Sequence, residues 1–487
     1  SDEDNSVLKG LRGHGDAWIV GGWVRDFLSG STLGDLDIAT TLKPSEVKEI
    51  FPRSLMFAEK YGTVTVRLDG AEEKMWDVTT LRSDGGYGDG RRPDNVEFGE
   101  NILSDLARRD FTINSLAIDE DGKIIEIANN CQDCNNIIDA NNNIVTPGFI
   151  DSHTHPIFTG ERSKEFFMRI NGKDYNEISK AGGGIFSTVE KLRSASDDEL
   201  YEISLKNILP FINNGTTTME AKSGYGLSIK DEIRSLEIIN RLNESLKIDI
   251  IPTFLGAHAI PQEYKKNDYI KLMCDEMIPE ISKKKLAVFC DVFCENGYFD
   301  TDDSMKILST AKEYGMIPRM HIDEFECLGG ALIANKVNAA SVDHLMAINE
   351  DSIKSLSDSN VIATLLPGTT FMLNKNKYAN GRKLIDSGCN VALATDFNPG
   401  TCTIRSLTQI MLLAVLNCGM SIEECFKGVT YNAAKSLLLM NEIGLIKENY
   451  KADLLFWNID SLNELVYWSD SSVVKLKKIM KNGDFID

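Results

Sequence analysis

Histidine is scarce in this 487-residue chain, and five of its six histidines stand at or just after short apolar runs. Such runs end directly before or at His153, His155, His321 and Asp396. Alternate residues on a strand share a face, so His153 and His155 can point to the same side. Three imidazoles and one carboxylate suit a borderline cation such as Zn or Fe and leave a position for water. We therefore predict one metal site from these four residues.

The same region offers groups for proton transfer and for substrate binding. Glu324 stands three residues after a predicted ligand, where it can take a proton from the attacking water and return it to a leaving nitrogen. His344, which ends the next apolar run, and His258 are further catalytic candidates. Arg162, Tyr225 and His258 are candidate substrate anchors, because a guanidinium matches a carboxylate with two parallel hydrogen bonds. A surface ion pair for Arg162 and a loop cap for Tyr225 are the structural alternatives.

The elements that must position these residues alternate in type. Apolar runs typical of strands are separated, in most cases by 20 to 40 residues, by amphipathic segments such as 197–212 and 303–314. This alternation predicts βα units around a parallel (β/α)8 barrel, whose βα loops build the active site at the carboxyl ends of the strands. The expected strands are 144–150, 216–220, 248–254, 287–293, 317–321, 340–342, 361–366 and 391–395.

The net charge of the chain restricts the classes of molecule that it can bind. The chain has 52 basic and 73 acidic residues, a net charge of −21, and residues 1–119 alone have 14 basic and 22 acidic residues. So acidic a chain repels phosphate backbones, which makes binding of tRNA or of an anionic membrane improbable. No apolar run approaches the length of a membrane helix and no signal peptide is visible, so we expect a cytoplasmic protein with a small-molecule substrate.

Residues from about 121 to 487 resemble the imidazolonepropionase family of the amidohydrolase superfamily. The resemblance is carried by the segments 145–155, 158–162, 181–185, 220–227, 254–258, 291–295, 321–325, 365–368 and 394–400. It implies one Zn or Fe held by His153, His155, His321 and Asp396, and a homodimer. It implies that 4-imidazolone-5-propanoate is hydrolysed to N-formimidoyl-L-glutamate in histidine degradation. The implied substrate contacts are Arg162, Tyr225, His258, Glu324, Asn398, Gly400 and Thr401.

Residues 17–119 resemble the head domain of the tRNA nucleotidyltransferase and poly(A) polymerase family. The motifs are 19–26, 35–40, 61–63, 79–82, 89–93 and 108–114, with expected strands at 17–20, 63–68 and 76–81. Glycines let a backbone close on a triphosphate, and a DxD pair can hold Mg ions. The residues that would bind nucleotide and Mg are Gly21, Gly22, Arg25, Asp35, Asp37, Arg109, Asp110 and Asn114, with Asp77 as a third carboxylate.

The junction of the two parts lacks a Gly/Ser/Pro linker and falls inside both folds. No helical body follows the head, and only residues 123–127 and 137–138 resemble strands before the barrel. After the barrel we expect strands at 444–445, 452–457 and 473–479. We expect three parts: a head at 1–119, a barrel at 148–440, and a small β-sandwich, short of strands, from 120–147 and 441–487. A chimeric fusion with one active hydrolase is the leading interpretation. A CCA-adding nucleotidyltransferase and an inactive fusion are the alternatives.

Overall fold

Two separate hydrophobic cores organise the chain. The computed structural model describes residues 2–20, 37–58, 63–68, 75–84, 96–98, 115–119, 121–128, 138–140, 144–173, 177, 182–469 and 476–486. The chain divides into two compact units. The first comprises Ser1–Leu116 and Ile127–Asp133, and the second comprises Ala117–Glu126 and Cys134–Asp487.

The described part of the first unit contains a five-stranded mixed sheet and two helices. Its strand order is β1-β2-β5-β4-β3, in which β2 and β5 run parallel and the other pairs run antiparallel. Trp76, Val47 and Leu11 are fully buried in its core. The three expected strands of the head are confirmed. The elements are α1 (Asp2–Arg12), β1 (Ala17–Val20), β2 (Asp37–Thr40), α3 (Pro44–Ile50), β3 (Leu55–Ala58), β4 (Thr63–Val66), β5 (Trp76–Thr80), β6 (Arg82–Asp84) and β7 (Val96–Phe98).

The second unit contains the predicted parallel barrel. Eight strands pair in sequence order, every pair parallel, and their apolar faces form the larger core. All eight expected strands are present, with ends that differ by a few residues. They are β11 (Phe149–Asp151), β12 (Thr216–Lys222), β13 (Asp249–Ala257), β14 (Phe289–Cys294), β15 (Ile317–Ile322), β16 (Ser341–His344), β17 (Ile362–Leu365) and β18 (Val391–Leu393).

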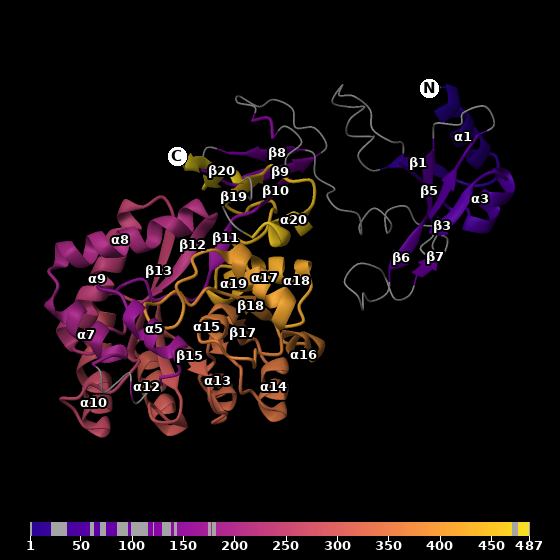
Figure 1. Cartoon of the computed structure of the whole chain (residues 1–487). Coiled ribbons are helices and arrows are strands. Elements are labelled where there is room, and N and C mark those ends of the chain that lie inside the picture. Colours follow the sequence, from indigo (N-terminus) through magenta and orange to yellow (C-terminus); the bar gives the residue numbers. More distant parts are fainter. Residues whose placement is uncertain are drawn as a thin grey trace. The chain divides into compact units, whose positions relative to one another are not determined.

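Helices surround these strands (Figure 1). Their starts follow local chemistry: the Ser196 hydroxyl accepts from Glu199 N at the start of α8, and Asp300 caps α12. The helices are α5 (Ser163–Ile170), α7 (Ile185–Ser194), α8 (Asp197–Asn213), α9 (Ile229–Ser245), α10 (Lys266–Leu272), η2 (Met273–Met277), α11 (Ile278–Lys283), α12 (Thr301–Glu313), α13 (Gly330–Val337), α14 (Glu350–Ser357), α15 (Pro367–Met372), α16 (Gly381–Asp386), α17 (Leu407–Asn417), α18 (Ile422–Gly428), α19 (Tyr431–Ser436) and α20 (Leu462–Tyr467).

The first expected strand, 144–150, is in fact two strands in two sheets. Residues Ile144–Pro147 form β10, which pairs antiparallel with β19 (Leu454–Trp457), and β11 then enters the barrel. Pro147 cannot donate to a ladder, and a side chain at Gly148 would collide with Thr217, so the run bends there. Beyond the strand ends, a parallel bridge between Thr154 and Phe397 joins the first and last segments of the barrel.

A small four-stranded sheet accompanies the barrel, in the order β10-β19-β20-β21, with β20 at Leu476–Lys481 and β21 at Asp484–Ile486. The hairpin of β8 (Ser115–Ile118) and β9 (Ile124–Ala128) forms a separate two-stranded sheet. Its residues Gly122 and Ile124 exchange backbone hydrogen bonds of 2.8–2.9 Å with the segment 449–452. Residues 444–445, expected as a strand, form a bend, so that prediction is wrong.

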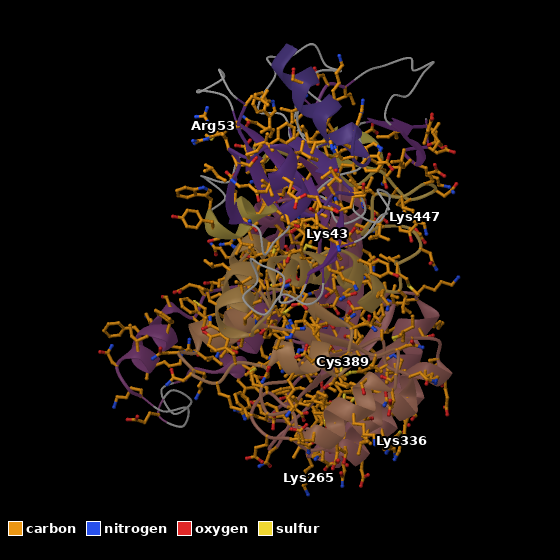
Figure 2. All side chains as sticks on the ribbon, turned by 90° about the vertical axis from the view of Figure 1, so that its right-hand side faces the viewer. Lys43, Arg53, Lys265, Lys336, Cys389 and Lys447 are labelled. Atoms are coloured by element: carbon orange, nitrogen blue, oxygen red, sulfur yellow. The ribbon has the colours of Figure 1, made fainter. Side chains whose placement is uncertain are left out.

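The labelled side chains of the barrel unit differ in exposure. Lys265 and Lys336 are exposed, whereas Cys389 is buried (Figure 2). Among the helices that the structure describes, none is long and apolar enough to cross a membrane.

Candidate metal centre and active site

The predicted metal ligands meet at the carboxyl ends of the barrel strands. His153 and His155 directly follow β11, His321 lies in β15, and Asp396 stands three residues after the end of β18. All four side chains are buried, none more than 3% exposed. The backbone binds the first and last segments together here, because Asp396 N donates to His153 O at 3.0 Å and His155 N to Phe397 O at 2.8 Å.

Their donor atoms converge on one point. His155 Nε2 lies 3.2 Å from His153 Nε2 and 3.4 Å from His321 Nε2. Asp396 Oδ1 lies 3.5 Å from His153 Nε2 and 3.3 Å from His155 Nε2. In a tetrahedral Zn site with bonds of about 2.0–2.1 Å, the ligand atoms are about 3.3–3.4 Å apart. The four side chains therefore fit a tetrahedrally coordinated cation. The three histidines are also close enough to one another to share an ion.

Two carboxylates orient two of these histidines. His153 Nδ1 lies 2.7 Å from Asp343 Oδ2, and His321 Nδ1 lies 3.1 Å from Asp291 Oδ1. A carboxylate at Nδ1 keeps the proton there and leaves the lone pair of Nε2 free for a metal. This role was not predicted from the sequence. The available signal was a charged residue inside an otherwise apolar strand, since Asp291 lies within Phe289–Cys294.

A buried ionic network holds these two carboxylates. Lys222 Nζ donates to Glu220 Oε1 at 2.6 Å and to Asp291 Oδ2 at 2.7 Å. Arg319 Nε lies 3.3 Å from Glu220 Oε1, and its Nη2 lies 3.6 Å from Asp343 Oδ2. All five groups are inaccessible to solvent.

The charge balance of this ionic network, taken together with Asp396, also fits a divalent cation. Lys222 and Arg319 supply two positive charges against four carboxylates, which are Glu220, Asp291, Asp343 and the predicted ligand Asp396. Two negative charges are thus left over in a buried place, where uncompensated charge is costly. A dication at the convergent donor atoms would cancel them.

The buried histidines differ in their pKa values. Burial lowers the pKa of His155 to about 4, well below that of His153. At His153, burial and Lys222 lower the pKa, but Asp343 and Asp396 outweigh them and raise it to about 9. Metal binding at His153 therefore competes with a proton.

Glu324 and His344 lie together beside the ligands. His344 Nε2 is 3.9 Å from Glu324 Oε2, and the His344 ring centroid is 5.4 Å from that of His321. Burial, followed by the carboxylates of Asp396 and Glu295, raises the pKa of Glu324 to about 8. Burial lowers the pKa of His344 to about 3, so its imidazole is neutral.

Aromatic rings line the next part of the site. His258 stacks on His155 with centroids 5.4 Å apart, and the Tyr225 ring lies 5.2 Å from His258. His258 Nδ1 lies 2.9 Å from Gly224 O, which leaves Nε2 for another partner. Tyr225 is only 3% exposed, and burial raises the pKa of its hydroxyl. The hydroxyl therefore stays protonated, able to donate or accept a hydrogen bond.

The loop after Asp396 is shaped by Asn398. Its Oδ1 accepts from Gly400 N at 2.8 Å and from Thr401 N at 2.7 Å, while its Nδ2 donates to Asp396 O at 2.8 Å. The predicted contacts Asn398, Gly400 and Thr401 thus form one hydrogen-bonded turn that starts at a predicted ligand. Arg162 reaches the same turn, because a Cβ on Gly400 would lie 2.3 Å from Arg162 Nη1.

Most predicted site residues of the head lie outside the described part of the chain: Gly21, Gly22, Arg25, Asp35, Arg109, Asp110 and Asn114. Asp37 is the first residue of β2 and the register partner of Asp77 in the parallel strand β5. The Asp77 carboxylate accepts a hydrogen bond of 2.8 Å from Thr65 Oγ1.

Comparison with known proteins gives two family matches. Residues 144–486 match the amidohydrolase family, and residues 17–139 match the poly A polymerase head domain. The second match extends across the β8–β9 hairpin, although residues 117–126 belong to the barrel's structural unit.

Curated relatives match the barrel part of the chain. An imidazolonepropionase of Geobacillus kaustophilus is 44% identical over 352 residues, which are 71% of this chain and 83% of that protein. An imidazolonepropionase of Thermoanaerobacter pseudethanolicus is 46% identical over 332 residues, 68% of this chain and 80% of that protein.

Solved structures share the fold at low identity. A 5-methylcytosine deaminase from Klebsiella pneumoniae has a TM-score of 0.61 at 17% identity, covering 76% of this chain and 94% of that one. A guanine deaminase from C. acetobutylicum has a TM-score of 0.60 at 19% identity with the same coverage. These likenesses support the barrel fold and nothing finer.

Proposed function

The chain belongs to the amidohydrolase family and, within it, to the imidazolonepropionases, and from this premise we propose that its barrel opens the cyclic amide of 4-imidazolone-5-propanoate with water. The product would be N-formimidoyl-L-glutamate, as in histidine degradation. A metal-dependent hydrolase is the general class. The specific substrate is supported by relatives at 40–46% identity that carry the name imidazolonepropionase.

The observation that carries the proposal is the convergence of three Nε2 atoms and Asp396 Oδ1 on one point. His153, His155, His321 and Asp396 would hold the cation, and this nitrogen and oxygen set accepts either Zn or Fe. When bound, such a cation activates water and polarises the substrate carbonyl as a Lewis acid.

Glu324 would move the proton. Its carboxyl group lies beside the predicted ligands, and its pKa of about 8 is near the working pH. A group with such a pKa can accept a proton from the attacking water and release it to the leaving ring nitrogen. The neutral His344, 3.9 Å away, would orient the water or the attacked oxygen.

The other predicted contacts would hold the substrate. Arg162 offers its guanidinium to the propanoate carboxylate, and Tyr225 and His258 face the ring from the aromatic side of the site. The turn of Asn398, Gly400 and Thr401 would supply backbone and hydroxyl groups. These roles go beyond the family match and stay proposals.

Replacing Asp396 with Ala tests the proposal. The full chain should contain about one equivalent of Zn or Fe and hydrolyse 4-imidazolone-5-propanoate. Asp396→Ala should lose both bound metal and turnover, because an oxygen ligand of a buried cation is removed. The exposed Asp358, changed to Ala, is the matched control and should retain both. Metal content by mass spectrometry and loss of substrate absorbance are the measurements. Full activity in Asp396→Ala would refute the metal assignment.

We do not propose nucleotidyl transfer by the head. Asp37 and Asp77 are register partners in neighbouring strands, and Mg binding there stays a prediction. A homodimer, the lack of tRNA binding and a cytoplasmic location also stay predictions. The last is supported by the eight cysteines that the structure describes, which are all free thiols, seven of them buried.

A further inference from the structure

Helix α5 does not contribute to the core. None of its residues is buried, and Phe167 and Ile170 are 66% and 59% exposed. Arg162 occupies the position just before the helix, and Glu165 and Arg169 follow at spacings of three and four residues, so these three side chains share one face. That face contacts Gly400 in the turn that follows the predicted ligand Asp396.

Arg162 is already paired. Its Nε donates to Glu165 Oε2 at 2.8 Å, and its Nη2 lies 2.7 Å from the same oxygen. Both side chains are mostly buried, at 14% and 12% exposure, so solvent screens the pair little. The charge of Arg162 is therefore largely balanced before any ligand arrives.

Arg169 makes no such ion pair with the residues that the structure describes. Its Nη1 and Nη2 lie 3.4 and 3.5 Å from Gly400 O, beyond the length of a good hydrogen bond. Its Nε is buried and has no hydrogen-bond partner among the residues that the structure describes. Burial and the neighbouring Arg162 lower its pKa, although Glu165 raises it.

The two guanidinium groups thus converge on one glycine with one carboxylate between them. One positive charge and several N–H donors are left over in a half-buried place, which is costly unless a ligand compensates them. Asn398 ties Gly400 to Asp396 through two hydrogen bonds of 2.8 Å, so this place adjoins the reacting centre. A carboxylate carried by the substrate has the charge and the acceptor geometry to fill it.

We propose that Arg169 is a second specificity-determining residue, which binds the substrate carboxylate together with Arg162 at Gly400. This inference rests on the proposed function, since it assumes that an anionic side arm of the substrate reaches the turn. Arg162 would then act as the partly neutralised member of the pair, positioned by Glu165. Arg169 would supply most of the net attraction for the anion.

Binding of a matched pair of non-hydrolysable ligands tests the inference without turnover. Imidazole-4-propanoate has the carboxylate and imidazole-4-propanamide is its neutral counterpart. Calorimetry on the metal-loaded full chain should give a tighter Kd for the propanoate. Arg169→Met should weaken propanoate binding by about 10- to 100-fold, as expected for the loss of a charge-assisted hydrogen bond, and leave the propanamide unchanged. Arg169→Lys should weaken propanoate binding by a smaller factor.

The control is Arg241→Met, which removes an exposed arginine that lies over the Tyr201 ring. It should change neither Kd, and the metal content of each variant reports whether the site is intact. Equal weakening of both ligands in Arg169→Met would mean a structural role and would overturn the inference. Equal binding of both ligands by the unmodified chain would overturn it as well. If the ligands behave as expected but the chain does not hydrolyse 4-imidazolone-5-propanoate, only the proposed function fails.

Discussion

At the residue scale, the site concentrates unusual backbone conformations. Asp323, His344 and Asp396 have positive φ angles of 54°, 84° and 52°. Residues other than glycine rarely adopt this region, because Cβ crowds the backbone, and they do so mainly where tertiary structure enforces it. All three stand at the ends of barrel strands, next to a predicted ligand or at one. The turns that aim the site's side chains are therefore themselves strained.

Asp323 makes the stability of the barrel depend on pH. Burial and the nearby Glu295 raise the pKa of its carboxyl group to about 6, from 3.8. Because the folded state holds the proton more tightly, the wild type loses stability as pH rises between those two values. Asn does not titrate, and it tolerates a left-handed backbone. Between pH 4.5 and 7.5, Asp323→Asn should gain about 2 kcal/mol relative to the wild type in urea unfolding. A difference between the two proteins that does not vary with pH would contradict this.

The metal ligands were easier to predict from the sequence than the charged residues around them. His153, His155, His321 and Asp396 stand out because polar residues at strand ends have few structural reasons to be there. Lys222 and Arg319 lie inside strands, and nothing in their spacing tells which carboxylate each one meets across the barrel. Arg169 was missed because it lies on an exposed helix, where an arginine is expected for solubility alone. Contacts between distant strands decide these roles.

At the element scale, the alternation of apolar runs with amphipathic segments predicted the barrel. It did not predict that the chain passes from one sheet to another between β10 and β11. Apolar residues stand at both ends of the run 144–150, with only Thr146, Pro147 and Gly148 between them, so the run was predicted as one strand. The partner strands decide otherwise: β10 pairs with β19 near the C-terminus and β11 with β12. Periodicity cannot reveal a change of partner. The strand predicted at 444–445 is wrong for a different reason. Two residues are too few to indicate that a segment pairs with another strand, and these two form a bend.

The turn of the β8–β9 hairpin gives a test at this scale. Gly122 has a φ of 75°, and a Cβ there would lie 1.9 Å from the backbone oxygen of Asn482. Gly315 has a similar φ of 84° with nothing within 4 Å. Gly315→Ala should cost about 1 kcal/mol for the left-handed backbone alone. Gly122→Ala should cost clearly more, because the hairpin must move away from its partner. Urea unfolding of the barrel unit measures the loss in free energy of unfolding for each variant. Equal losses would contradict the close packing of the hairpin against Asn482.

At the scale of the whole molecule, the chain has two cores that share no buried residue. Trp76 is fully buried in the head and Trp457 in the sheet beside the barrel, where its Nε1 donates to Thr146 Oγ1 at 2.8 Å. Each core can therefore be weakened by one comparable substitution. The family matches lead to the same division, since one covers 17–139 and the other 144–486.

Trp76→Ala should cost the head about 3–5 kcal/mol and leave metal content and turnover unchanged. Trp457→Ala should cost the hydrolase unit a similar amount and lower its metal content on mild heating. Scanning calorimetry, with metal analysis of each variant, separates the two transitions. Loss of metal in Trp76→Ala at the same temperature as in Trp457→Ala would show that the units unfold as one.

The hairpin has a practical consequence for protein engineering. Residues 115–128 fall inside the stretch that matches the head domain, yet Gly122 and Ile124 hydrogen-bond to the segment 449–452 of the hydrolase. A designer who wishes to exchange the head for another cargo should therefore splice before Ser115. A junction at the start of β10 would follow the family boundary. It would, however, remove the peptide groups of Gly122 and Ile124 that hydrogen-bond to the segment 449–452.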